Sequence, residues 1–155
     1  MIYTPKVNLA IKLMYEKHKD QVDKQGIPYV FHPFIVANNM ETEEETIVAL
    51  LHDVIEDTNT SIEDLKKFGF NDKIINAIDT LTHKENEDYE TYIARIATNK
   101  LATKVKIADL RHNMDITRFA NTIIPDNYLK KYKIYDQSLQ YLENIENQDN
   151  NKRTR

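Results

Sequence analysis

Apolar residues recur at helical spacing along most of this chain. The first such stripe consists of Val7, Ala10 and Met14, which lie three or four positions apart. Thr4-Pro5 stands shortly before it, and this pair can cap a helix and supply its first residue. A helix is therefore predicted near the N-terminus, and the same reasoning applies further along.

Later stripes and start signals predict further helices in series. They place helices over 33–40, from Thr42 into the segment that follows, from Ser61 to a stop at Gly69, over 71–81, from Asp88, over 101–116 and from Pro125-Asp126 onwards. No segment makes a convincing strand, and only two glycines and four prolines are available for the turns of a β-rich fold. The sequence predicts an all-α bundle of about six to eight helices.

The bundle is expected to form a single domain. A chain of 155 residues can bury a core of its own, and no linker or internal repeat divides it. The domain is predicted over residues 1–146. Residues 147–155 are predicted to be a polar tail that frays, because this segment holds no apolar side chain.

Composition narrows the possible functions. The formal net charge of −4 argues against an extended nucleic-acid surface, although it is compatible with a local phosphate pocket. No apolar run approaches the length that spans a membrane, and the N-terminus lacks the apolar core of a signal peptide, so a cytoplasmic protein is expected. The chain has no cysteine, so a metal would need His, Asp, Glu or main-chain oxygen as ligands.

One stretch joins the apolar pattern to a group of polar side chains. Apolar residues 47–51 run directly into His52 and Asp53, and Glu56 and Asp57 follow within one turn. If the helix continues, each of the first two shares a face with the acid four positions later. Unpaired buried charge is costly, so such a cluster must be paired, metal-bound or solvated. Taken alone, an adjacent His-Asp pair is a weak signal, and a helix end where acids meet solvent is the better interpretation.

Two further positions make a site more plausible than a helix end. His32 stands at the mouth of a predicted helix, and Asp109 lies on the apolar face of another. Together with His52 and Asp53 they give two imidazoles and two carboxylates from three helices, a set that suits Mn, Fe, Co or Zn. The alternative for Asp109 is a buried salt bridge to Arg111 or another arginine.

These residues lie in three motifs that resemble a known family. The motifs are GIPYVFHP over 26–33, LLHDVIEDT over 50–58 and VKIADLRHNM over 105–114. Their spaced H…HD…D residues resemble the signature of HD-domain metal-dependent phosphohydrolases. The flanking residues resemble the hydrolase domain of RelA/SpoT-type enzymes, which remove the 3′-pyrophosphate of the alarmone (p)ppGpp with Mn²⁺. The resemblance covers about residues 4 to 144.

The resemblance implies an HD-type helical bundle, a divalent metal, most favourably Mn²⁺, and a small-molecule nucleotide substrate. It implies metal ligands at His32, His52, Asp53 and Asp109, water activation by Glu56 and Asp57, and substrate contacts at Lys24, Asn113 and Tyr135. Lys131 and Arg111 are additional basic residues that could face a pyrophosphate. Because the chain ends where multidomain members begin their synthetase domain, alarmone synthesis is not expected.

Two positions depart from the family pattern. Asp23 stands where the family has an arginine that packs against the guanine base, and Ile116 stands where it often has a small hydroxyl or polar residue. An aspartate cannot stack on a purine as a guanidinium does, and it repels a polyanion. We therefore expect weaker binding of the base, which Asp23→Arg would improve, with the metal chemistry intact.

Three other interpretations of the sequence stay open. The chain could be an HD phosphatase or nucleotidase that acts on nucleoside mono- or triphosphates. It could also be a catalytically silent nucleotide-binding regulator, although the presence of every expected ligand argues against this. A purely structural helical module would have to explain why these histidines and acids sit at helix starts or core-facing positions without a cation.

Overall fold

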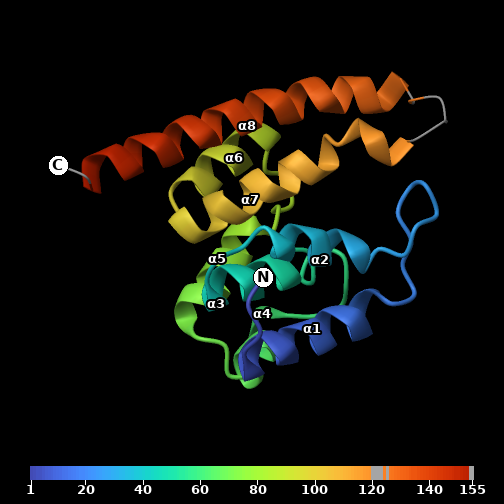
Figure 1. Cartoon of the computed structure of the whole chain (residues 1–155), viewed down its shortest axis with the longest axis vertical. Helices are drawn as coiled ribbons and strands as arrows, with labels where there is room; N and C mark the ends of the chain where they lie inside the picture. Colours follow the sequence, from blue (N-terminus) through green and yellow to red (C-terminus); the bar gives the residue numbers. More distant parts are fainter. Residues whose placement is uncertain (120–123, 125, 154–155) are drawn as a thin grey trace.

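The computed structural model describes residues 1–119, 124 and 126–153, and within them it is helical apart from turns, loops and one isolated β-bridge. Figure 1 shows the arrangement of the helices along the chain. The elements are α1 (Pro5–His18), α2 (Phe31–Asn38), α3 (Glu43–Leu51), α4 (Ile62–Lys67), α5 (Asp72–Leu81), α6 (Tyr89–Ala97), α7 (Lys100–Asn113), the 3₁₀ helix η1 (Ile116–Phe119) and α8 (Asp126–Arg153). The predicted all-α fold is confirmed.

The sequence signals for helix starts correspond to real caps. The side chains that accept a hydrogen bond from the first turn are those of Thr4 for α1, Thr42 for α3, Ser61 for α4 and Asp88 for α6. Gly69 follows α4 with a φ of +78°, a left-handed conformation that glycine adopts without a steric penalty. Each of these caps acts on the first turn of its own helix, so the helix starts follow from local sequence.

Several helix ends differ from the sequence prediction. α7 ends at Asn113 instead of residue 116, and α2 ends at Asn38 instead of residue 40. α2 begins at Phe31, before the predicted start at Pro33. α3 ends at Leu51 instead of continuing through the polar stretch. After Leu51 the chain forms turns. The Val54 N–H donates to the Leu51 carbonyl, three positions back, at 3.1 Å, and the Asp57 N–H donates to the Asp53 carbonyl, four positions back, at 2.9 Å. His52 and the acids after it therefore leave the backbone from a turn.

The C-terminal helix is longer than the sequence suggested. α8 continues to Arg153, so most of the segment predicted to fray is helical. The predicted start at Pro125 lies outside the described residues, and so do residues 154–155 of the expected tail. The boundary between domain and tail at residue 146 stays a prediction, and it falls inside α8.

α3 and α7 form the centre of the molecule. Every residue of α3 from Thr46 to Leu51 is buried, and the helix contacts α1, α2, α5 and α7. α7 also contacts α2, α5, α6 and α8, and α8 runs beside α6 and α7 at the opposite end from α1 (Figure 1). The start of α2, the turn after α3 and the middle of α7 are thereby brought together. No helix in the described ranges is both long and apolar enough to cross a membrane.

Candidate metal centre and its cavity

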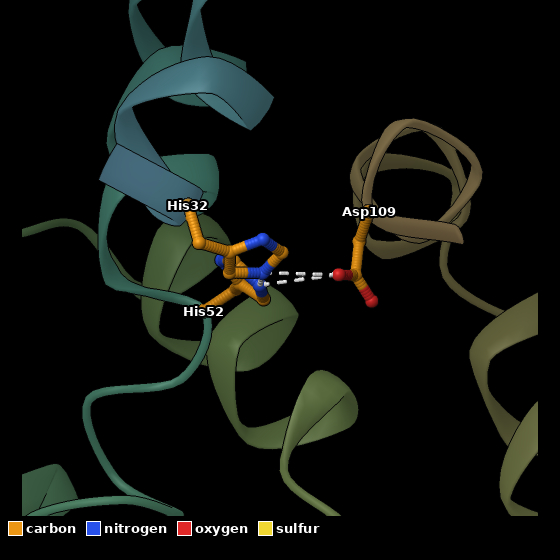
Figure 2. Close-up of side chains that lie close together, drawn as sticks. All are labelled: His32, His52 and Asp109. Carbon is orange, nitrogen blue, oxygen red and sulfur yellow. Dashed lines mark hydrogen bonds and ion pairs between the residues drawn. The ribbon is translucent and has the colours of Figure 1, made fainter. Parts of the chain in front are cut away.

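Four side chains predicted as ligands converge where α2, the turn after α3 and α7 meet. We call them the His–Asp cluster: His32, His52, Asp53 and Asp109. His32 Nε2 lies 3.1 Å from Asp109 Oδ1, and His52 Nε2 lies 3.0 Å from Asp53 Oδ2. Figure 2 shows both imidazoles directed at the Asp109 carboxylate, and one donor atom from each of these three residues lies within 4.8 Å of the others.

The main chain fixes the orientation of His52. Its Nδ1 lies 2.7 Å from the carbonyl oxygen of Ala49, which can only accept a hydrogen bond. Nδ1 therefore carries a proton, and Nε2 of the neutral ring points its lone pair into the cluster. Burial lowers the pKa of His52, but the Asp53 and Asp109 carboxylates outweigh burial and raise the pKa well above its usual value. The site therefore attracts positive charge, as a cation site should.

Asp109 is held ionised because a partly buried lysine, Lys106, faces it. Its Oδ2 lies 2.8 Å from Lys106 Nζ, and its Oδ1 accepts a hydrogen bond of 2.6 Å from Asn113 Nδ2. Burial raises the pKa of Asp109, but Lys106 and the two histidines hold it well below the usual value. The suggested partner Arg111 was wrong, because Arg111 pairs with Glu143 at the surface. Lys106 was missed, although it stands one helical turn before Asp109.

Tyr29 holds the other carboxylate of the cluster. Its hydroxyl donates to Asp53 Oδ2 at 2.5 Å. Burial raises the pKa of Asp53, yet the positive field of His52 and the bonds from both histidines lower it overall. Tyr29 had no predicted role, and its only sequence signal was its place in the GIPYVFHP motif. The donor set of two imidazole nitrogens and two ionised carboxylates fits a divalent cation of intermediate hardness.

A second unpredicted contact involves His112. Its Nδ1 lies 2.7 Å from Nδ1 of His32, and the two rings lie 4.9 Å apart with an angle of 33° between their planes. Burial and the nearby charges of His32 and Arg118 lower the pKa of His112 to about 4. Neutral His112 can therefore accept a hydrogen bond from His32 at ordinary pH.

A cavity of about 550 Å³ opens above the cluster. The predicted site residues that line it are Lys24, His32, Asp53, Glu56, Asp57, Asp109, Asn113, Lys131 and Tyr135, whereas His52 and Arg111 are not in the lining. His52 lies beneath it and is 3% exposed. The structure thus brings together residues that are up to 111 positions apart in the sequence, and the cluster forms the floor of a space large enough for a small molecule.

Glu56 and Asp57 lie at the edge of this cavity and are exposed. Glu56 Oε2 accepts a hydrogen bond of 3.0 Å from the His83 N–H, and this bond orients the carboxylate. Burial and the charge of Asp53 raise the pKa of Asp57. Carboxylates in these positions can orient or deprotonate a water molecule without binding an ion themselves.

The opposite side of the cavity carries two lysines. Lys24 comes from the loop before α2 and Lys131 from α8, and both are exposed. The charge of Lys24 is the main cause that lowers the pKa of Lys131, so the two ammonium groups lie close together. Neither forms an ion pair with a carboxylate within the described ranges. We call Lys24, Lys131, Glu56 and Asp57 the cavity mouth, and its lysine side suits an anion.

Asp23 does not present an unpaired negative charge to this cavity. Its Oδ2 lies 2.8 Å from Arg118 Nη2, and its Oδ1 accepts hydrogen bonds from the backbone N–H groups of Gln25 and Ile27 at 2.8 and 3.0 Å. The expectation that Asp23 repels a polyanion was therefore wrong. Arg118, which the sequence analysis missed, brings a guanidinium into the cavity wall from η1. Ile116 is 51% exposed and is not part of the cavity lining.

Comparison with known proteins gives a consistent set of relatives, although no model of a known protein family matches the chain. It is 32% identical to a probable GTP pyrophosphokinase of Mycobacterium leprae over 135 residues, which cover 76% of this chain and 17% of that protein. It is 29% identical to a guanosine-3′,5′-bis(diphosphate) 3′-pyrophosphohydrolase of Aquifex aeolicus over 124 residues, or 72% of this chain and 18% of that protein. The chain thus spans less than a fifth of these relatives.

A solved structure matches along the whole chain. It is described as a metazoan ortholog of SpoT that hydrolyzes ppGpp, with a TM-score of 0.75, 22% sequence identity and coverage of 99% of this chain and 98% of that one. This likeness confirms the HD-type fold. The resemblance to RelA/SpoT-type proteins that the three motifs indicated is also confirmed.

Proposed function

We propose that this chain is a metal-dependent phosphohydrolase that removes the 3′-diphosphate of (p)ppGpp. The observation that carries the proposal is the convergence of two imidazole Nε2 atoms and two ionised carboxylates on the floor of a cavity whose mouth carries two lysines without acidic partners. The relatives named as (p)ppGpp hydrolases support the choice of substrate.

The His–Asp cluster is the proposed metal site, with Mn²⁺ as the favoured ion and Fe, Co or Zn as alternatives. A divalent ion held there would act as a Lewis acid on a phosphate oxygen and make a water molecule nucleophilic near neutral pH. His52 and Asp109 are already arranged for it, because Ala49 and Lys106 fix the ligand atoms that face inward. Preorganised ligands lose little entropy when they bind.

The residues of the cavity mouth are assigned to the reacting water and to the phosphates. Glu56 and Asp57 accept the proton of the water that attacks the phosphorus bonded to the ribose 3′-oxygen. The bond between that phosphorus and the 3′-oxygen breaks, the 3′-oxygen takes up a proton, and pyrophosphate leaves. Lys24 and Lys131 bind phosphate oxygens. Asn113, which already bonds Asp109, and Tyr135 are assigned to contacts with the substrate.

A phosphatase that acts on other nucleotides is the second candidate. The observation that favours it is the altered base side of the pocket, where Asp23 and its partner Arg118 stand at the position of the family's arginine. The two candidates share the metal site and differ only in what the cavity recognises.

A nucleotide panel tests the proposal. Protein loaded with Mn²⁺ is incubated with ppGpp, pppGpp, GTP, ATP and GMP, and the products are separated by anion-exchange chromatography. We expect ppGpp to give GDP and pyrophosphate in equal amounts, with Asp109→Asn as an inactive control. Hydrolysis of the other nucleotides alone would support the second candidate. Binding of ppGpp without hydrolysis of any nucleotide would indicate a silent regulator and contradict the proposal.

A further inference from the structure

The cluster contains two imidazoles that are held in different ways. His52 donates from Nδ1 to a main-chain carbonyl, which no side-chain substitution removes. His32 has its Nε2 in the cluster, 3.1 Å from Asp109 Oδ1, so its Nδ1 also needs an acceptor. The atom that lies 2.7 Å from His32 Nδ1 is Nδ1 of His112. The orientation of one ligand thus depends on a side chain.

Only one arrangement of protons satisfies this contact when His32 Nε2 binds a cation. Two ring nitrogens at 2.7 Å share a single proton, because two N–H groups that face each other repel. If Nε2 of neutral His32 offers its lone pair to a cation, the ring proton is on Nδ1. His32 Nδ1–H then donates, and His112 must accept at Nδ1 and carry its own proton on Nε2. His112 therefore selects the tautomer of His32.

The position of His112 on α7 links the orientation of His32 to the helix that carries Asp109. His112 lies three positions after Asp109 on α7, so the same helix supplies one cluster carboxylate and the acceptor that orients a histidine from α2. It is half-buried, and it lines a cavity of about 420 Å³ that His32 also lines. His112 is not among the residues that line the cavity above the cluster. Its hydrogen-bond contact with the cluster is the one to His32 Nδ1.

We propose that His112 is a positioning residue that holds His32 in the tautomer and orientation required for metal binding. This inference rests on the proposed metal site. Groups that orient a metal-bound histidine typically change metal affinity by about 10- to 100-fold when they are removed. Loss of the acceptor at Nδ1 should therefore weaken metal binding by that amount without the loss of a ligand atom.

Three substitutions of His112 test whether a hydrogen-bond acceptor at the position of Nδ1 is required, or whether any side chain of similar size is sufficient. His112→Asn places an amide oxygen near the position of the lost Nδ1, whereas His112→Gln places it near Nε2, and His112→Leu supplies no acceptor. Arg111→Leu is the matched control, because Arg111 is the neighbour on α7 and its side chain pairs with Glu143 at the surface. Thermal unfolding by circular dichroism confirms that each variant folds.

The measurements are the dissociation constant of Mn²⁺ by calorimetry and the visible absorption of the Co²⁺ form. We expect His112→Leu and His112→Gln to weaken Mn²⁺ binding by about 10- to 100-fold and to change the Co²⁺ spectrum. His112→Asn should recover most of the affinity, and Arg111→Leu should match the wild type. Equal weakening in the three His112 variants, or no weakening in any, would overturn the inference.

His32→Ala distinguishes this failure from failure of the metal site. If His32→Ala binds Mn²⁺ as tightly as the wild type, His32 is not a ligand and the proposed site is wrong. If His32→Ala loses the metal while His112→Leu and His112→Gln keep it, the site stands and only the role of His112 is rejected.

Discussion

The His–Asp cluster and the cavity mouth are built on opposite principles. In the cluster, the side chains of His32, His52 and Asp109 are 8%, 3% and 5% exposed, and further side chains or carbonyls bond to each. At the mouth the lysines and acids are exposed, and the two ammonium groups lie close together. The side chains of the cluster are held by other groups of the protein, whereas the two lysines of the mouth have no carboxylate partner among the described residues.

This difference predicts a ranking of substitutions. Removal of one partner from a buried charged network leaves an uncompensated charge in a low dielectric, which is expensive. Removal of an exposed charge changes the free energy less, because water and salt screen that charge. Substitutions in the cluster should therefore abolish metal binding and chemistry, and substitutions at the mouth should tune rate or affinity.

The largest effect is expected for the cluster itself. His52→Ala and Asp109→Asn should lose the bound metal and lower turnover of ppGpp by roughly 10³-fold or more, since a metal supplies several kcal/mol of transition-state stabilisation. Elemental analysis of the purified proteins and steady-state kinetics measure both. Asp136→Asn, at a half-buried position of α8 outside the cavity lining, is the control. Equal metal content in the wild type and both variants would remove these residues as ligands.

The next largest effect is expected for Glu56, which is assigned to the attacking water. Glu56→Gln should lower turnover by roughly 100-fold, the scale of general acid–base assistance, while metal content stays at the wild-type level. Glu63→Gln, an exposed glutamate on α4, should have no effect on either quantity. If Glu56→Gln loses the metal, Glu56 is a ligand and belongs to the cluster. Full turnover in Glu56→Gln would also reject its assigned role.

A smaller effect is expected from the lysines. Lys24→Ala and Lys131→Ala should each raise the Michaelis constant for ppGpp by about tenfold, the cost of one charge-assisted hydrogen bond, with little change in the rate constant. Lys133→Ala, on the same helix but outside the cavity lining, is the control for Lys131. A fall in the rate constant at an unchanged Michaelis constant would place these lysines in the chemistry instead.

The smallest effect, and the one whose sign is most informative, concerns Asp23. From the sequence, Asp23→Arg should lower the Michaelis constant for ppGpp. In the structure it removes the partner of Arg118 and two backbone contacts of the loop, so we expect an increase of about fivefold or less. The charge-swapped double variant Asp23→Arg/Arg118→Asp should recover part of the loss. A lower Michaelis constant for Asp23→Arg alone would show that the base contact outweighs the ion pair.

The residues of the His–Asp cluster could be predicted from the sequence far better than the groups that orient them. Its ligands lie in short motifs whose residue types suit a divalent ion, so His32, His52, Asp53 and Asp109 could be chosen together. Their orienting groups could not, because these arise from tertiary packing. The bond from His32 to His112 joins residues 80 positions apart, and the bond from Arg118 to Asp23 joins residues 95 positions apart.

The helix boundaries show the same difference between features set by neighbouring residues and features set by tertiary contacts. The capping residues predicted α3, α4 and α6 correctly because a cap acts on the turn beside it. The end of α3 at Leu51 was missed, because His52 takes its position from the cluster and not from helix propensity. A continuous helix would have placed Glu56 one turn above His52, whereas the turn directs Glu56 towards the His83 backbone.

The most direct test of the central claim is a titration of metal-free protein with Mn²⁺ in the presence of ppGpp. Bound Mn²⁺ is measured by electron paramagnetic resonance, and pyrophosphate release is measured in the same samples. If the cluster holds the catalytic metal, activity rises in proportion to bound Mn²⁺, stops rising at one ion per chain, and neither signal appears in His52→Ala. Hydrolysis of ppGpp by the metal-free protein, or saturation with Mn²⁺ without any hydrolysis, would contradict the account.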